Sequence, residues 1–333
     1  MRLLLTLALK NEQGNAADRY AGDRYQIAAA IVVDWESKKI LREFCYASPP
    51  GQRNPQHMRF AFGQLLDRHL AVVTYTEVLF VRLPAWEVER TVTVPHFNDL
   101  HHLLVRGDEL WVCNTGLQAV HRMTLGGRVL DTFSTTETPT WATYDRAEDY
   151  RLLDTKPHAI HPNYLFELDG DIWVTRFMTR DAVHLHDHRR RMDVGVGLCH
   201  DGCVRDGLVY FTTVTGHVVV CDARTGARVR DIDLNRLRED KVQLGWCRGI
   251  ELLPDGKALV GFSQFRMSRQ RQIVEWILTW GPRLPSRVVL YDLSKPAVLD
   301  ELVLPDPYAF GALFSIIQVP EHLVFSSAVA SRR

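Results

Sequence analysis

The chain has 333 residues, which is long enough for one large domain or two average ones. Its hydrophobic content of 46% is ordinary for a globular protein, and its 40 basic residues balance 40 acidic ones. A chain with no net charge has no overall field to attract a polyanion, so the composition argues against nucleic acid as the partner.

The N-terminal segment begins with a short apolar run, Leu3 to Leu9, followed by Lys10-Asn11-Glu12. This run has no small-residue cleavage site after it, so it predicts a β-strand and not a signal peptide. The other apolar stretch, Ile273 to Trp280, is far too short to span a bilayer. The six cysteines contain no CxxC pair, which favours a reducing compartment. We therefore expect a cytoplasmic protein with no membrane span.

Units of four short strands recur along the chain at a spacing of about forty residues, which is typical of propeller blades. Two N-terminal strands, Ala28 to Asp34 and Lys39 to Phe44, come before the first unit. The units that follow cover residues 64–94, 103–133, 164–196, 203–234 and 249–304.

A further inner strand is predicted at Leu313 to Gln318, followed by a short strand at Leu323-Val324-Phe325. The two N-terminal strands would complete this last unit, so that both chain ends pair and no sheet edge stays exposed. The place of Leu3 to Leu9 in this unit stays open. We predict an all-β, six-bladed β-propeller closed by its N- and C-terminal strands, with residues 1–333 in a single domain. A large β-sandwich is the alternative.

Two long segments interrupt the repeat, residues 135–156 and residues 266–286. Loops of this length in a compact domain are usually functional, and their aromatic content argues against disorder. We predict lids over a binding site, and a packed surface helix is the alternative reading of the second segment.

Superposing the units brings polar residues to one mouth of the central channel, because the inner strands of a propeller line that channel. Alignment of Val105-Arg106-Gly107 with Val204-Arg205-Asp206 places His101 at the same position as His200. The same alignment predicts a ring of channel-facing residues, namely Phe62, His101, Tyr164, His200 and Arg248.

A second group of polar residues is predicted in the loops before and after these strands. It comprises His57, His96, Asn98, Asp99, Asn114, His158, His161, Asn163, Arg176 and Gln264. For the Pro- or Gln-flanked histidines of this group, at positions 57, 96 and 158, a structural role is the alternative. Four other histidines are expected to face solvent or the blade core: His102, His184, His186 and His188.

These residue types suit acid–base or metal chemistry. Imidazole titrates near neutral pH, so His101 and His200 are the candidate acid and base, with Arg248 to hold a carboxylate or phosphate. The predicted ligand-binding residues are Asn98, Asp99, Asn114, Tyr164 and Arg176. The candidate ligands of a divalent metal (Zn, Fe, Mn or Ca) are His96, His101, His161 and His200, because imidazole is a common metal ligand. There is no HExxH motif, GxSxG elbow, Walker A loop or Rossmann fingerprint to indicate another chemistry.

Several of these segments resemble a group of uncharacterised bacterial propeller proteins. The resemblance covers the second to fifth units and rests on Asn98-Asp99-Leu100-His101, residues 109–115, His161-Pro162-Asn163, His200-Asp201-Gly202 and Cys247-Arg248-Gly249-Ile250. It implies the propeller fold and the same site residues, but no settled activity. The chain departs from the group at Tyr164, where those proteins often have glycine.

More distantly, the chain is similar to the gluconolactonase and strictosidine-synthase-like six-bladed propellers. The resemblance implies a catalytic centre at this mouth, which in those proteins is often calcium held by Asn, Asp and Glu. No acidic set of that kind is visible in this sequence, and a fold does not by itself define a function.

We therefore expect a small-molecule enzyme, a hydrolase, lyase or isomerase of secondary metabolism, that binds a polar ligand. The alternative is a non-catalytic propeller that binds a peptide or protein partner on the same face. An enclosed pocket lined by histidine would favour the enzyme, whereas a wide face with exposed Trp276 and Trp280 would favour the binding module. No oligomeric state is predicted.

Overall fold

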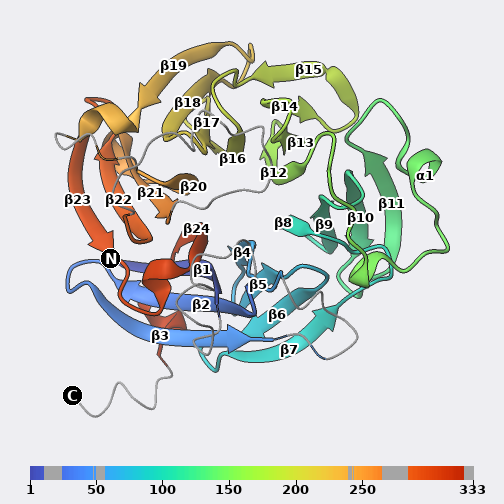
Figure 1. Ribbon diagram of the computed structural model, residues 1–333, viewed down its shortest axis with the longest axis horizontal. Helices are drawn as coiled ribbons and strands as arrows, with labels where there is room; N and C mark the ends of the chain where they lie inside the picture. The colour runs from blue at the N-terminus through green and yellow to red at the C-terminus, as the bar shows by residue number, and fades with distance from the viewer. Residues whose placement is uncertain are drawn as a thin grey trace.

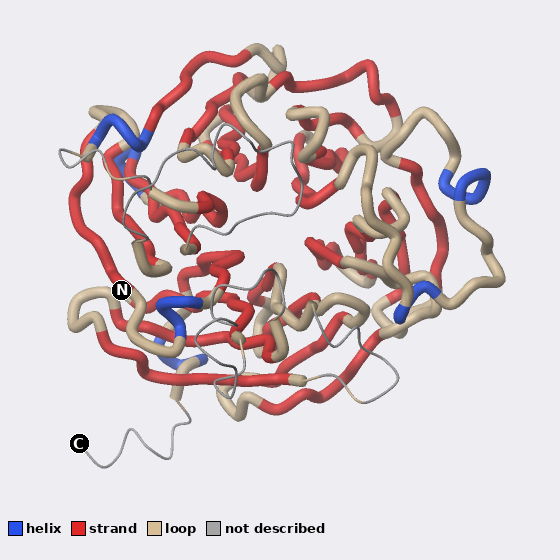
Figure 2. The backbone as a smooth tube through the Cα atoms, viewed as in Figure 1, coloured by secondary structure: helices blue, strands red, loops and turns tan. Residues whose placement is uncertain are grey.

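The computed structural model describes residues 1–10, 25–47, 49, 57–238, 242, 244–264 and 284–325. Within these residues, six four-stranded sheets are arranged radially around a central axis (Figure 1). Figure 2 shows that strands make up nearly all of the regular structure, with only short helical turns between them. The predicted six-bladed propeller is confirmed.

Every blade places one strand at the axis and its last strand at the rim (Figure 1). Blade 1 contains β4 (Phe62–Leu65), β5 (His69–Val73), β6 (Val78–Arg82) and β7 (Glu87–Val92). Blade 2 contains β8 (Leu100–Arg106), β9 (Glu109–Asn114), β10 (Ala119–Thr124) and β11 (Val129–Ser134). Blade 3 contains β12 (Pro162–Leu168), β13 (Asp171–Arg176), β14 (Asp181–His184) and β15 (Asp187–Asp193). Blade 4 contains β16 (Cys199–Arg205), β17 (Leu208–Thr213), β18 (His217–Asp222) and β19 (Arg228–Asp233). Blade 5 contains β20 (Trp246–Leu252), β21 (Lys257–Ser263), β22 (Arg287–Asp292) and β23 (Ala297–Val303).

The closing blade combines the two ends of the described chain, with β24 (Ala312–Gln318) at the axis, then β1 (Arg2–Leu9), β2 (Ile27–Asp34) and β3 (Lys39–Tyr46). The run Leu3 to Leu9, left unplaced by the sequence, is its second strand. Leu5 pairs with Ile316 on one side and with Ile31 on the other. The predicted strand at Leu323 to Phe325 is wrong. A single 3-10 turn, η6 (Glu321–Leu323), follows Pro320 instead, because the four strand positions of this blade are already filled.

The inner strands begin earlier than the apolar alternation indicated. β8 begins at Leu100 where Leu103 was expected, and β16 begins at Cys199 where Cys203 was expected. A register shift lies near the start of both strands, where one extra residue is inserted against the neighbouring strand. Such a β-bulge interrupts the two-residue alternation of side chains, and this hides the true strand start from a pattern-based prediction.

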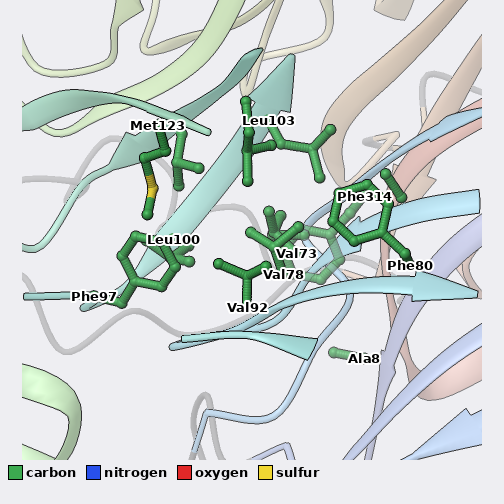
Figure 3. Packing of buried hydrophobic residues seen from close by; sticks show 14 of the residues in the cluster. Ala8, Val73, Val78, Phe80, Val92, Phe97, Leu100, Leu103, Met123 and Phe314 are labelled. Carbon is green, nitrogen blue, oxygen red and sulfur yellow. The ribbon is translucent and has the colours of Figure 1, made fainter. Parts of the chain in front are cut away.

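The core lies between the blades, not within any one of them. Figure 3 shows the cluster between blades 1 and 2, where Val78 and Phe80 of β6 face Leu103 of β8 and Met123 of β10, with Phe314 of β24 beside them. Because neighbouring blades cover both faces of each sheet, a middle strand can be apolar along most of its length, as the sequence of β2 shows.

The segment of residues 135–156 contains α1 (Thr140–Thr143) and η1 (Tyr150–Leu152). α1 lies at the outer edge of the ring beside β11 (Figure 1). The chain then returns to the loop before β8, where the Tyr150 amide donates to the Pro95 carbonyl at 2.7 Å. Most of the second predicted lid, residues 266–283, lies outside the described residues. No helix in the described ranges has the length and apolar character that crossing a membrane requires.

Candidate functional site

Five inner strands, β8, β12, β16, β20 and β24, are each seven residues long. We therefore number the residues of each strand from position 1 to position 7. Position 2 of these strands holds His101, Asn163, His200, Cys247 and Leu313. Position 3 holds His102, Tyr164, Asp201, Arg248 and Phe314. In blade 1, the pairing of Leu65 with Leu70 before the turn aligns Phe62 with position 3.

A cavity of about 20 Å³ lies on the axis, with lining residues from all six blades. We call it the axial cavity, and its lining consists of Ala61, Phe62, His101, His102, Asn163, Tyr164, His200, Asp201, Arg248 and Phe314. The volume suffices for about one water molecule. Consecutive residues at positions 2 and 3 both reach the cavity because the bulges lie at this level of the strands.

The structure places all five residues of the predicted ring on this cavity: Phe62, His101, Tyr164, His200 and Arg248. His101 and His200 occupy the same position, as aligned from the sequence, whereas Tyr164 and Arg248 stand one residue later. His102, expected to face solvent or the blade core, lines the cavity instead, and Phe314 was missed. The bulges explain why His102 lines the cavity beside His101. Each bulge changes by one residue which side chains of the strand point to the axis.

His102 is buried between two aromatic rings. Its ring centroid lies 3.6 Å from that of Phe62 and 3.9 Å from that of Tyr164. Neither ring nitrogen has a hydrogen-bond partner among the described residues. Burial holds the pKa of His102 well below its usual value, so its imidazole is neutral.

His101 is held in one tautomer by the backbone. Its Nδ1 lies 2.8 Å from the carbonyl oxygen of Asp99, which only accepts, and 3.4 Å from Arg59 Nη2, which only donates, so the shorter contact assigns the proton to Nδ1. Burial, with a smaller contribution from the nearby Arg59, lowers the pKa of His101 well below its usual value. The neutral ring therefore has its lone pair on Nε2.

His200 has the opposite tautomer. The side-chain amide nitrogen of Asn163 lies 2.9 Å from the Cys199 carbonyl and 2.9 Å from His200 Nδ1. The first contact identifies this atom as the NH₂ donor, so His200 Nδ1 accepts a hydrogen bond from it. In a neutral ring the proton of His200 is then on Nε2. The two position-2 histidines, both in the lining of the cavity, thus carry their ring protons on opposite nitrogens when both rings are neutral.

Asp201 and Arg248 are neighbours in the ring of position 3. Asp201 accepts hydrogen bonds from the Thr212 hydroxyl and, at 3.0 Å, from the Gly249 amide. Burial raises the pKa of Asp201 to about 6, although these hydrogen bonds and the charge of Arg248 oppose the shift. The Arg248 Nε donates to the Leu313 carbonyl at 2.8 Å, and its guanidinium lies 3.4 Å from the ring centroid of Phe314. Since Asp201 is the one carboxylate in the described lining, the axial cavity does not fit calcium, which needs six to eight oxygen ligands.

Asp99 is the centre of a second polar group, beside the cavity. Its Oδ1 pairs with Arg59, and its Oδ2 lies 3.9 Å from Lys156 Nζ and 3.8 Å from His158 Nδ1. Burial acts to raise the pKa of Asp99, but the charges of Lys156 and Arg59 outweigh it and hold the pKa well below its usual range. The His161 ring lies 4.7 Å from that of His101 and connects this group to the cavity.

A chain of hydrogen bonds orients His158. The Asn98 amide nitrogen donates to the Tyr150 and Leu153 carbonyls, so its Oδ1 is the acceptor for the Thr155 hydroxyl at 2.9 Å. The Thr155 oxygen can then only accept from His158 Nε2, which lies 3.1 Å away. This leaves a lone pair on His158 Nδ1, which faces His161 Nδ1 at 3.1 Å.

Six of the predicted catalytic, ligand-binding or metal-ligating residues do not line the axial cavity, and two of these, Asp99 and His161, belong to the second polar group described above. His96 contacts the segment of residues 135–156, with its Nε2 2.7 Å from the Arg146 carbonyl. Asn98 orients Thr155 as described above, and Asn114 donates to the His96 carbonyl at 2.6 Å. Arg176 forms a two-point pair with Asp181 in blade 3. These side chains hold loops and strands of the scaffold together.

No protein-family model and no curated protein matches this chain. Solved structures resemble it at low sequence identity. A candidate 6-phosphogluconolactonase from Bacteroides fragilis superposes with a TM-score of 0.54 and 10% identity, over 92% of this chain and 83% of that one. A chain of a mitotic checkpoint complex gives a TM-score of 0.49 with 10% identity, over 84% and 75% of the two chains.

The dihydro-heme d1 dehydrogenase NirN gives a TM-score of 0.43 with 11% identity, over 85% of this chain and 54% of that one. At such identities, the likeness to the Bacteroides fragilis protein shows a common fold alone. What the chain does has to be argued from its own residues.

Proposed function

We propose that the protein is an enzyme that hydrolyses a small polar molecule at the axial cavity. The observation that carries this proposal is that His101 and His200 line one cavity with hydrogen-bond partners that assign them opposite tautomers. In this assignment His101 Nε2 takes a proton from water as the general base and then passes it to the leaving group, while the neutral His200 Nε2–H donates a hydrogen bond to the substrate oxygen on which negative charge develops. Groups placed in this way contribute about 10²–10⁴-fold to a rate.

The size and charge of the cavity support hydrolysis over isomerisation. A volume of about 20 Å³ suits a water molecule between the two histidines, while the substrate would lie at the mouth above them. Arg248 supplies a positive charge in a buried position, where it would stabilise the negative charge that develops on an attacked carbonyl or bind a substrate carboxylate.

The test is turnover of a panel of small lactones, esters and amides that carry a carboxylate or phosphate. Sugar lactones belong in the panel because the Bacteroides fragilis protein of the same fold is a candidate lactonase. We expect His101→Gln and His200→Gln to lower kcat by on the order of 10²-fold or more, because the first removes the proton-transfer group and the second removes the donor to the developing negative charge. His69→Gln is the matched control, since His69 follows the turn after β4 and pairs with Glu89. Full activity in either cavity variant, or no turnover of any substrate, would contradict the proposal.

The alternative is a non-catalytic propeller that binds a peptide or protein on this face. Trp276 and Trp280, which would mark such a surface, lie outside the described residues. Capture of a defined peptide that His101→Gln and His200→Gln leave intact, in a protein without turnover, would favour this second function.

A further inference from the structure

The loops before β8 and β12 bring two imidazoles and a carboxylate together beside the axial cavity. They are His158, His161 and Asp99, and their potential ligand atoms all lie within 4.8 Å of one another. Asp99 and His158 are buried. Asp99 Oδ2 is shielded from solvent and has no hydrogen-bond partner among the described residues. A buried carboxylate oxygen without a hydrogen bond is costly, which indicates that another group belongs there.

We propose that Asp99, His158 and His161 bind a divalent transition-metal ion through Asp99 Oδ2 and the two Nδ1 atoms. Of the metal ligands expected from the sequence, only His161 belongs to this set. The others, His96, His101 and His200, lie elsewhere or serve the axial cavity.

The spacing of the two imidazoles fits a shared ion. Their Nδ1 atoms are 3.1 Å apart. Two nitrogens bound to one ion at about 2.0–2.1 Å lie roughly 2.9–3.4 Å apart when the angle between them is octahedral or tetrahedral. Asp99 Oδ2 lies 3.8 Å from His158 Nδ1, and the three ligand atoms all lie within 4.8 Å of one another, so the carboxylate would complete the set by moving toward the two nitrogens.

The surroundings of His158 match those of a metal ligand. A ligating histidine usually donates its other N–H to a fixed acceptor, which orients the ring. His158 Nε2 donates to Thr155, and Thr155 is itself fixed by Asn98. This chain leaves His158 Nδ1 with a lone pair and no freedom to turn away. The segment of residues 135–156 thereby supports the site, because Tyr150 and Leu153 hold Asn98.

The positively charged side chains near Asp99 leave its Oδ2 atom accessible to a metal cation. Arg59 is buried and stays on Oδ1. Lys156 lies 3.9 Å from Oδ2, and its side chain is 35% exposed, so it can swing into solvent when an ion enters. Two imidazole nitrogens and one carboxylate suit Zn, Fe or Mn, and this donor set is poor for calcium, which prefers oxygen.

The site adjoins His101 through His161, so a bound ion could polarise a substrate at the mouth of the cavity. That role rests on the proposed function, whereas binding of the ion does not.

The test therefore measures binding of the ion first. Untagged full-length protein is stripped with EDTA, and Zn²⁺ is titrated by calorimetry with elemental analysis of the dialysed product.

We expect one Zn²⁺ per chain, and a loss of affinity of at least 100-fold in His158→Gln and in His161→Gln. Thr155→Val should weaken binding by about 10–100-fold while leaving all three ligands in place. His217→Gln, which removes a surface histidine paired with Asp231, is the control and should bind as the wild type does. Circular dichroism of each variant establishes that it is folded.

Absence of stoichiometric Zn²⁺ in folded wild-type protein would overturn the site, as would equal affinity in the His158 and His161 variants. Tight binding without turnover of any substrate would contradict the proposed hydrolase and keep the metal site. Turnover that survives EDTA, in a protein that binds no Zn²⁺, would contradict the metal site and keep the proposed hydrolase.

Discussion

At the scale of single residues, the axial cavity places ionisable side chains where water cannot fully solvate them. Asp201 shows the consequence most clearly. Its hydrogen bonds from Thr212 and the Gly249 amide favour the charged form, yet burial dominates and its pKa rises to about 6. The carboxyl group is thus destabilising in its ionised form, and the cavity tolerates it because Arg248 is near.

Asp201→Asn tests this balance. A folded-state pKa above the unfolded value of 3.8 means that the native protein binds the extra proton, so Asp201 stabilises the fold at low pH and loses that effect as pH rises through about 6. From pH 4.5 to 7.5 the wild type should lose on the order of 2 kcal/mol relative to the variant, because Asn keeps the acceptor oxygen and cannot ionise.

The measurement is urea denaturation of both proteins at the two pH values. Asp206→Asn, a change at an exposed carboxylate of the turn after β16, is the control and should follow the wild type. Parallel stability curves for the wild type and Asp201→Asn would show that Asp201 has an ordinary pKa in the fold.

At the scale of elements, the bulged starts of the inner strands decide which residues reach the axis. In blade 5 the bulge lies between Cys247 and Ile250, opposite Gly261 of β21. A Cβ at Gly261 would lie 2.6 Å from the Arg248 carbonyl oxygen and 2.5 Å from Leu313 Cδ2. The strand that positions Arg248 therefore needs glycine beside it for lack of space, not for its backbone angles.

Gly261→Ala should destabilise the protein by about 1–3 kcal/mol, since the added methyl overpacks a rigid neighbourhood. Without the clash, alanine in a strand would be neutral or better than glycine, so the sign of the change is diagnostic. Gly126→Ala is the matched control, because its nearest neighbour would be Thr124 Oγ1 at 3.8 Å. Equal free energies of unfolding for the two variants would mean that the bulge yields to the methyl group.

At the scale of the whole molecule, one contact between sequence-distant strands closes the ring. β1 pairs with β24, and the hydroxyl groups of Thr6 and Ser315 lie 2.7 Å apart in the buried centre of that pairing. Every other blade is formed by one continuous stretch of chain. The closing blade is thus the place where opening of the ring would begin.

A disulfide between β1 and β24 at this contact should stabilise the closed ring against unfolding. In a Cys45→Ser background, which removes the exposed cysteine, Thr6→Cys with Ser315→Cys is expected to oxidise and to stabilise the protein by on the order of 3 kcal/mol. The comparison is between oxidised and reduced samples of the same variant in denaturant. Equal midpoints would show that separation of β1 from β24 does not limit unfolding.

The sequence alone was enough to predict the propeller, its number of blades and the alignment of His101 with His200, because strand alternation and turn residues are local signals that repeat. It was not enough to place Leu3 to Leu9, to bring His102 to the axis or to join Asp99 with His158 and His161. A strand's neighbours, a bulge and a contact between loops of different blades depend on chain segments far apart in sequence. Only the closed ring brings those segments together, and the chemistry proposed here depends on the contacts it creates.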